Sequence, residues 1–262
     1  MKLGIDEYSK LDSPLHRWEP RCKLIGLMVL IFAFSYIQDL RMLLAMLLVT
    51  AVIYITSGLP VSFLLGRLRY PSFFLLVVIL TLPFLSGETT VMSIGPLDLR
   101  EEGLLSVVLI ATRFLSILTI GLVLFSTAPF LTTIKAMRAL GLPAILADMV
   151  LLSFRYLHEI GGNLQQMQTS MRLRGFRRNH FSTRSFRVLA WLSGSILVRS
   201  YERSEWVYKA MTLRGYGHAS PPRDEFQAHP NDIIALGVFI LIATGFVVGD
   251  IICGHDTASL LQ

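Results

Sequence analysis

The chain has 262 residues, of which 53% are hydrophobic and only 16% are charged, and its mean hydropathy is +0.59. A soluble domain of this length carries about a quarter charged residues, so the composition excludes an ordinary soluble protein and predicts a membrane protein. The formal net charge of +6 is compatible with nucleic acid, anionic lipid or an acidic partner, and the position of the charge along the chain must decide between them.

The first 22 residues are predicted to form a cytoplasmic N-terminal segment. Residues 1–20 are polar and mixed in charge, and they lack the apolar core of a cleavable signal peptide. The two cysteines, Cys22 and Cys253, are far apart in the sequence, which predicts neither a disulfide nor a metal site.

Five apolar segments are predicted to be membrane helices, four of them within residues 23–128 and the last within residues 231–262. The first three are shorter than the roughly twenty residues that a spanning helix needs, so we expect flanking cations or neighbouring helices to compensate. Only Gln38 and Asp39 separate the first two, which should form a tight antiparallel hairpin. The five segments are residues 23–37, 41–57, 72–86, 103–128 and 233–253.

The charges in the connecting segments predict the orientation of these helices. Five Lys and Arg residues lie within residues 2–23, whereas the loop 87–102 holds four acidic residues and one Arg. Because Lys and Arg stay on the cytoplasmic side, we expect the N-terminus inside, the acidic loop outside and the tail 254–262 outside.

Residues 129–230 are predicted to form a cytoplasmic coupling domain of long amphipathic helices. Fourteen Lys and Arg residues oppose six acidic residues there, a net charge of +8, so the rest of the chain carries −2. One helix is expected over residues 148–171, where apolar residues recur at steps of three and four. A second is expected over residues 185–211. Its apolar centre could be a sixth span, but it is short and flanked by Arg187 and Arg199, which favours a helix lying against the membrane or against its neighbour. The predicted fold class is therefore all-α: about five membrane helices and this coupling domain.

A six-residue motif occurs twice in the basic segment, forty residues apart: Met-Arg-Leu-Arg-Gly-Phe at 171–176 and Met-Thr-Leu-Arg-Gly-Tyr at 211–216. Each copy closes a helical stretch, so we expect its glycine to adopt the left-handed conformation that ends a helix. The preceding arginine then lies at the negative end of the helix dipole, where its guanidinium can bind a carboxylate. Two such ends suit a partner with two equivalent sites. The predicted docking residues are Leu173, Arg174, Gly175, Leu213, Arg214 and Gly215, supported by Met171, Phe176, Met211 and Tyr216.

A single Arg-Gly pair ends many helices without any further role, so the motif alone leaves both docking and simple helix termination open.

Three further motifs precede the Arg-Gly copies in the sequence. Residues 13–23, Ser-Pro-Leu-His-Arg-Trp-Glu-Pro-Arg-Cys-Lys, precede the first apolar segment. Leu-Gly-Leu-Pro at 140–143 and Phe-Arg-Tyr at 154–156 precede the first Arg-Gly copy.

With these motifs in this order, the chain resembles the transmembrane (T) component of energy-coupling-factor (ECF) ABC importers over nearly its whole length. That family begins its first helix with Ser-x-Leu-His-Arg-Leu-Asp-Pro-Arg-x-Lys, from which this chain departs at Trp18 and Glu19. It also carries two Arg-Gly tripeptides at the ends of two crossed coupling helices. The cobalt-type branch, the CbiQ family, is the most similar.

The resemblance implies that Arg174 and Arg214 dock onto two ATP-binding cassette subunits, or onto a homodimer of them. It places ATP and Mg²⁺ on those partners, and the transported cobalt or related transition-metal ion on a separate substrate-binding membrane subunit. It also implies a location in the cytoplasmic (inner) membrane. The sequence contains no Walker-type Gly-x-x-x-x-Gly-Lys loop, and no catalytic, cofactor or metal site is expected on this chain.

Two other function classes were weighed. A stand-alone secondary transporter or channel needs polar groups inside the spans, and Arg113 lies there. We expect Arg113 to have a structural role, such as pairing with Asp250. A nucleic-acid binder is not expected, because the positive charges are dispersed over amphipathic helices without a recognition pattern. The six histidines are scattered and form no metal-binding spacing.

Overall fold

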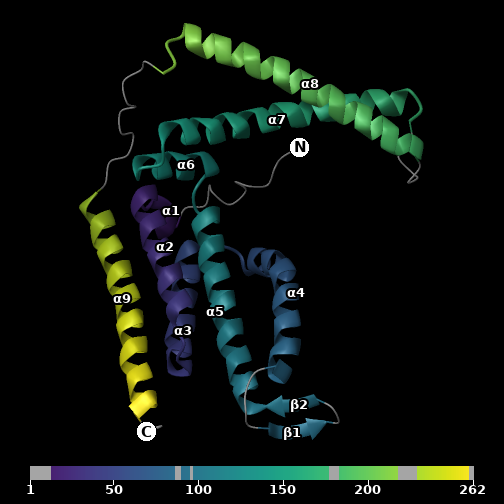
Figure 1. Ribbon diagram of the computed structural model, residues 1–262. Coiled ribbons are helices and arrows are strands. Elements are labelled where there is room, and N and C mark those ends of the chain that lie inside the picture. The colour runs from purple at the N-terminus through teal and green to yellow at the C-terminus, as the bar shows by residue number, and fades with distance from the viewer. Residues whose placement is uncertain (1–12, 86–89, 95–96, 177–182, 218–228, 260–262) are drawn as a thin grey trace. The chain divides into compact units, whose positions relative to one another are not determined.

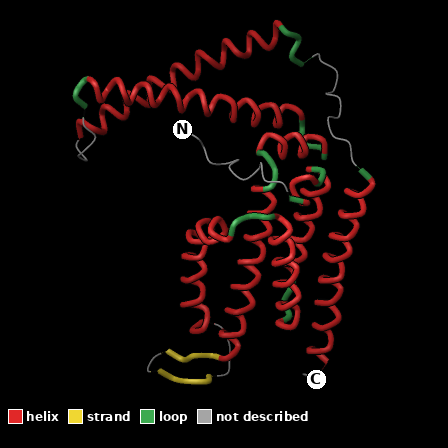
Figure 2. The backbone as a smooth tube through the Cα atoms, turned by 180° about the vertical axis from the view of Figure 1, so that it is seen from behind, coloured by secondary structure: helices red, strands yellow, loops and turns green. Residues whose placement is uncertain are grey.

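The computed structural model describes residues 13–85, 90–94, 97–176, 183–217 and 229–259 (Figure 1). Within these ranges the chain is helical apart from one short hairpin, so the predicted all-α class is confirmed (Figure 2). The elements are α1 (Pro14–Arg17), α2 (Pro20–Tyr36), the 3-10 helix η1 (Leu40–Met42), α3 (Leu43–Ser57), α4 (Val61–Leu85), β1 (Thr90–Ile94), β2 (Leu97–Arg100), α5 (Glu101–Ser126), α6 (Phe130–Ala139), α7 (Ala144–Leu173), α8 (Thr183–Leu213) and α9 (Pro230–Ser259).

The chain divides into two compact units. One, here called the two-helix unit, covers residues 142–225 and contains α7 and α8. The other, here called the bundle, covers residues 4–141 and 226–262 and contains all other elements. Helix α6 lies within the predicted coupling domain, yet it belongs to the bundle and packs against α2.

Helix α2 is the centre of the bundle, where it packs against α5, α6 and α9. Its residues Leu27, Leu30 and Phe34 are completely buried, and the Phe34 ring meets the edge of Phe246 from α9 at a centroid distance of 5.2 Å. Helices α3 and α4 pack on α5. Because the apolar residues of α2 face neighbours on several sides, its sequence shows no single apolar stripe.

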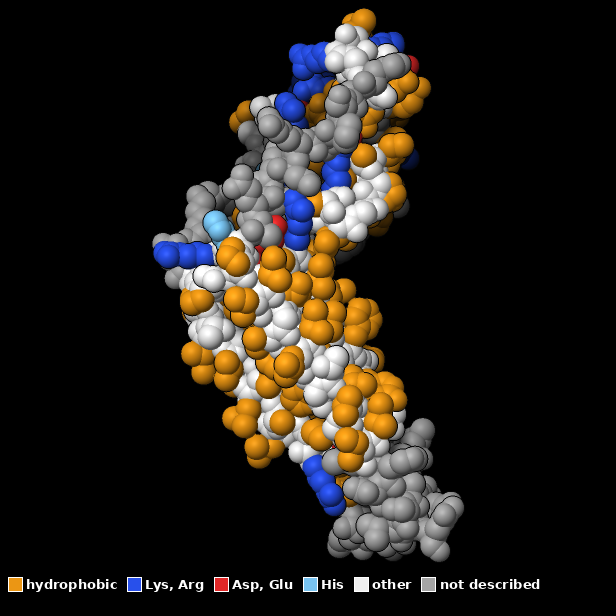
Figure 3. All heavy atoms as spheres, turned by 90° about the vertical axis from the view of Figure 1, so that its left-hand side faces the viewer, with side chains coloured by type: hydrophobic (Ala, Val, Ile, Leu, Met, Phe, Trp, Pro, Cys, Tyr) orange, Lys and Arg blue, Asp and Glu red, His pale blue; other side chains and the backbone are white. Residues whose placement is uncertain are grey.

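Four helices in the described residues are long and apolar enough to cross a membrane: Leu40–Ser57, Val61–Leu82, Leu105–Ser126 and Pro230–Ile252. They correspond to the second to fifth predicted spans. Helix α2 corresponds to the first, but its 17 residues are roughly 26 Å long, short of the ~30 Å hydrocarbon core. Hydrophobic side chains cover the face of the bundle on the α9 side (Figure 3), as expected for a surface in contact with lipid.

The predicted start of the third span at residue 72 is wrong. Helix α4 begins at Val61 and includes Arg67 and Arg69, which lie between the predicted spans 41–57 and 72–86. The side chain of Arg67 lies over the ring of Phe63, 5.4 Å from its centroid, one helical turn earlier. The helix is bent (Figure 1) and contains Pro71, whose ring and missing amide bend helices.

Side chains from two other helices bind the turn between α2 and η1. Arg113 Nη2 of α5 donates a hydrogen bond to the carbonyl of Ile37. Asp250 Oδ1 of α9 accepts hydrogen bonds from the amides of Gln38 at 2.9 Å and Asp39 at 3.0 Å. Backbone groups in a membrane must be satisfied within the protein. Arg113 therefore has the expected structural role. It acts by binding the turn, and Asp250 binds the same turn through other backbone groups.

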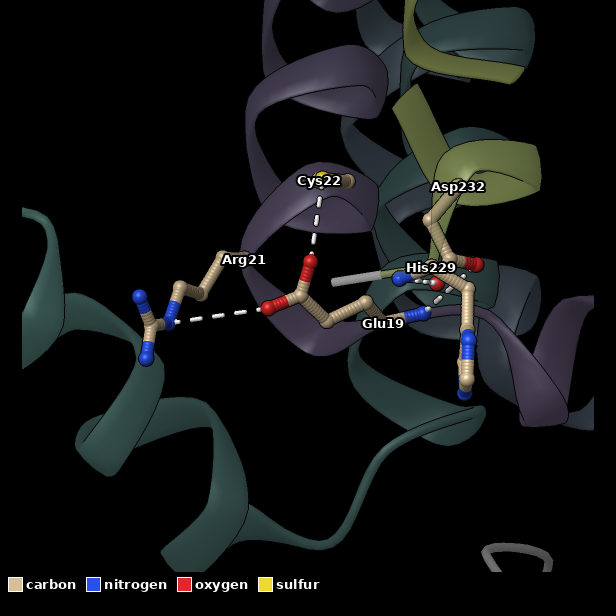
Figure 4. A network of polar contacts seen from close by, with 5 residues as sticks. All are labelled: Glu19, Arg21, Cys22, His229 and Asp232. Carbon is tan, nitrogen blue, oxygen red and sulfur yellow. Dashed lines mark hydrogen bonds and ion pairs between the residues drawn. The ribbon is translucent and has the colours of Figure 1, made fainter. Parts of the chain in front are cut away.

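The motif at residues 13–23 joins the N-terminal part of the chain to α9. Trp18 Nε1 donates to the carbonyl of Asp232 at 3.2 Å, and the Glu19 amide donates to Asp232 Oδ1 at 3.4 Å. Asp232 Oδ2 also accepts from the His229 amide at 3.0 Å (Figure 4). The Trp18 ring packs on Phe239 at a centroid distance of 5.1 Å. Trp18 and Glu19, where this chain departs from the usual motif, thus both contact the start of α9.

The last residue of the motif, Lys23, joins the same region to the end of α5. Its side chain is 2% exposed, and its Nζ donates to the carbonyls of Leu15 and Thr127, both at 3.2 Å. Thr127 directly follows α5, so one buried ammonium group holds α1, α2 and the end of α5 together. The motif therefore has a structural function in the bundle.

Candidate docking surface

The two helices of the two-helix unit cross in opposite directions (Figure 1). Arg203 of α8 forms an ion pair with Glu159 of α7. Nearer the start of α7, Asp148 Oδ2 accepts a hydrogen bond from Tyr216 Oη at 3.2 Å. Since residue numbers rise along one helix as they fall along the other, the C-terminal ends of α7 and α8 lie on opposite sides of the crossing.

Both helices end in the same backbone motif. The amide of Gly175 donates to Arg172 O, and the amide of Phe176 donates to Met171 O, each at 3.0 Å. The amides of Gly215 and Tyr216 make the same two bonds at the same distances, to the carbonyls of Thr212 and Met211. This is the Schellman motif, which satisfies the last carbonyls of a helix.

The glycines of these motifs have the left-handed conformation that the sequence predicts, with φ of +83° at Gly175 and +80° at Gly215. Each glycine turns the chain away from the helix axis directly after the arginine. The repeated residues therefore form two equivalent structures, here called the first tip (residues 173–175) and the second tip (residues 213–215).

The tips expose both apolar and charged side chains. Leu173 is 84% exposed and Leu213 is 89% exposed, values that leave almost the whole leucine side chain in water. Arg174 and Arg214 are also exposed, and neither binds another residue in the part of the chain that the structure describes. A water-exposed leucine beside an unpaired guanidinium is the combination that a partner surface can bury.

The four supporting residues of the prediction lie behind the tips. Met171, Met211 and Phe176 are half-buried, whereas Tyr216 is 40% exposed. The hydroxyl of Tyr216 binds Asp148 of α7, so the structure uses Tyr216 to hold α8 against α7. The most exposed apolar side chains of the motif are those of the predicted docking residues Leu173 and Leu213.

The tips are far apart. Arg174 lies fifteen residues beyond Glu159, and Arg214 lies eleven residues beyond Arg203 in the opposite direction. At about 1.5 Å per helical residue, the tips lie roughly 22 Å and 16 Å from the crossing. They can therefore contact two separate sites on a partner at the same time.

A groove of about 1020 Å³ lies between α7 and α8. Its lining includes Met149, Ile160 and Met167 from α7 and Trp206 and Met211 from α8. Trp206 is 71% exposed and is not among the residues predicted from the sequence. An aromatic residue in the charged half of an amphipathic helix is a signal that could have identified it.

The described residues contain no group of three or more His, Cys, Asp or Glu side chains placed to hold a metal ion. Cys22 is buried and its Sγ lies 3.2 Å from Glu19 Oε2, in the junction between the N-terminal motif and α9 (Figure 4). The features that the two-helix unit exposes are the two helix tips and the groove between α7 and α8.

Comparison with known proteins gives a consistent result. The CbiQ family model, described as cobalt transport protein, matches residues 12–224. Three energy-coupling factor transporter transmembrane proteins named EcfT are also similar. The protein from Heliobacterium modesticaldum is 25% identical over 82% of this chain and 84% of its own length. Those from Listeria monocytogenes (EcfT 1) and Lacticaseibacillus paracasei are 25% and 26% identical over 94% of this chain, and over 97% and 98% of their own lengths.

Proposed function

Because the chain belongs to the CbiQ family of cobalt transport proteins, we propose that it couples ATP hydrolysis by partner subunits to substrate import. Its relatives of similar length are transmembrane components of energy-coupling factor transporters. The chain is a multi-pass membrane protein with four helices long and apolar enough to cross the bilayer among its described residues. In this role it binds no nucleotide and performs no chemistry itself.

The observation that carries this proposal is the pair of matching helix tips. Each tip offers an exposed leucine, and a guanidinium with no partner among the described residues, at the end of a long helix. A groove with a carboxylate at one side and an apolar floor would accommodate both groups. Two ATP-binding cassette subunits, or a homodimer of them, provide two equivalent grooves for two equivalent tips, and ATP and Mg²⁺ bind to those subunits.

The charge distribution supports a cytoplasmic position for the tips. The segment that contains them has a net charge of +8, and Lys and Arg remain on the cytoplasmic side of a membrane. The N-terminus lies on the same side in this arrangement, which is that of a protein in the cytoplasmic (inner) membrane.

The proposed substrate is cobalt or a related transition-metal ion, as the description of the matching family suggests. A separate substrate-binding membrane subunit holds this ion. The groove between α7 and α8, with its exposed Trp206, is a suitable surface for that subunit because apolar and aromatic side chains dominate interface energies.

The test reverses the charges of both tips. We expect the R174E/R214E variant to remain in the membrane but to lose its ATPase subunits during purification in mild detergent, because each arginine is replaced by a group that a carboxylate repels. R187E/R199E makes the same charge change on α8 away from the tips and should retain the ATPases. If R174E/R214E copurifies with the ATPases as the wild type does, the docking role is wrong.

A stand-alone transporter makes the opposite prediction. The purified chain in liposomes would then move Co²⁺ without ATPase subunits. We expect no such flux, because the intramembrane cation Arg113 is engaged by the turn at Ile37.

A further inference from the structure

Three residues with low helix propensity occur in succession in the middle of α7: Gly161, Gly162 and Asn163. Glycine lowers helix stability because its backbone loses the most freedom on folding, and asparagine competes for the backbone hydrogen bonds. Helix α7 has 30 residues, contacts α8 and ends in the first tip, so its sequence would be expected to avoid such a run. The run therefore needs a reason.

Packing does not supply that reason. A Cβ atom built on Gly161 or Gly162 meets nothing within 4 Å, so no neighbouring described residue requires the absence of a side chain. Neither glycine has a positive φ, so the backbone conformation does not require glycine either. Alanine would fit both positions and would strengthen the helix.

The position of the run relative to the crossing is informative. Asp148 binds Tyr216, just after α8, and Glu159 binds Arg203 of α8, and both of these polar contacts lie on the N-terminal side of the glycines. The first tip lies on the C-terminal side. The run thus lies between the part of α7 that makes these polar contacts and the part that carries Arg174, where Met167 lines the groove to α8 with an apolar side chain.

We propose that residues 161–163 are a hinge at which the C-terminal part of α7, with the first tip, changes its angle to α8. The N-terminal part of α7 and the second half of α8 form one body that carries the second tip. Bending at the hinge changes the separation of the two tips without breaking the Arg203–Glu159 ion pair. The use of this motion rests on the proposed coupling function: a pair of ATPase subunits that opens and closes needs two contact points whose separation can follow it.

The hinge itself is tested in the chain alone. Nitroxide labels at S170C and S204C report the distance between the C-terminal part of α7 and α8, in a chain in lipid nanodiscs whose Cys22 and Cys253 are replaced by serine. We expect a broad distance distribution by double electron–electron resonance, which narrows in G161A/G162A. The G194A variant is the control, because Gly194 lies in the middle of α8 and also has open space around its Cβ position. Equal widths for the wild type and G161A/G162A would overturn the hinge.

The coupling role of the hinge is tested with the copurifying ATPase subunits bound. We expect the label distance to shift between ADP and a non-hydrolysable ATP analogue in the wild type and in G194A, and to stay fixed in G161A/G162A. An unchanged shift in G161A/G162A would overturn the coupling role. If G161A/G162A no longer binds the ATPases, the glycines are contact residues and the hinge proposal is wrong. These outcomes are separate from the docking test, which depends on Arg174 and Arg214.

Discussion

At the scale of single residues, the two glycines of the tips show what a local pattern can predict. Whether a helix ends at Gly175 or Gly215 depends on the few residues around it, because the Schellman bonds join residues at most five positions apart. The sequence therefore predicts both left-handed glycines correctly. The contact between Tyr216 and Asp148 was not predictable, because these residues are 68 positions apart and meet only through the way in which α7 and α8 cross.

A prediction follows for these glycines. An L-amino acid in the left-handed region is destabilised by roughly 1–2 kcal/mol, so G175A/G215A should unwind the last turn of α7 and α8. We expect faster amide hydrogen exchange at residues 172–176 and 212–216, together with weaker binding of the ATPase subunits. G121A, in α5 with no positive φ and open space around the Cβ position, should change neither. Unchanged exchange at both tips would contradict this account.

At the scale of elements, the turn after α2 explains how a helix too short for the bilayer is accommodated. Hydropathy alone predicts this segment as a span but does not show which groups form hydrogen bonds with the backbone of the turn at its end. Those groups are the side chains of Arg113 in α5 and Asp250 in α9, which are far from the turn in sequence. The wrong start of α4 has a related cause: Arg67 and Arg69 resemble loop charges, but a cation on a helix can extend towards the interface.

The turn gives a prediction for Asp250. D250A leaves the part-buried amides of Gln38 and Asp39 without this acceptor, and the loss of a hydrogen bond costs about 0.5–1.5 kcal/mol. We expect a clearly lower thermal unfolding midpoint in detergent. D250N keeps an oxygen that can accept both hydrogen bonds and should lie between D250A and the wild type. Identical midpoints for D250A and D250N would show that these bonds do not stabilise the bundle.

At the scale of the whole molecule, the N-terminal motif is the feature that joins distant parts of the chain. Trp18 and Glu19 bind Asp232, more than 200 residues away, and Lys23 binds the carbonyl of Thr127. The sequence shows the motif as a resemblance only, since these contacts depend on the assembled bundle. The concentration of positive charge in one segment, by contrast, could be read from the sequence, because counting charges requires no tertiary structure.

Trp18 tests this junction. W18A removes the contact with the Phe239 ring and the hydrogen bond to Asp232, and large-to-small changes of buried aromatic residues cost about 3–5 kcal/mol. We expect lower yield in the membrane and a lower unfolding midpoint. W18L introduces the leucine of the family motif that residues 13–23 resemble and should lose much less. If W18A is as stable as the wild type, the junction does not hold α9.

Leu173 and Leu213, at 84% and 89% exposure, also affect the fate of surplus copies of the protein. If the tips dock as proposed, a copy without ATPase subunits keeps two apolar side chains exposed, and chaperones and proteases recognise exposed apolar groups. Docking would bury both leucines and remove that signal. The proposed function therefore predicts that the amount of this chain falls in cells that lack the ATPase subunits, which immunoblotting of membranes from such cells would measure.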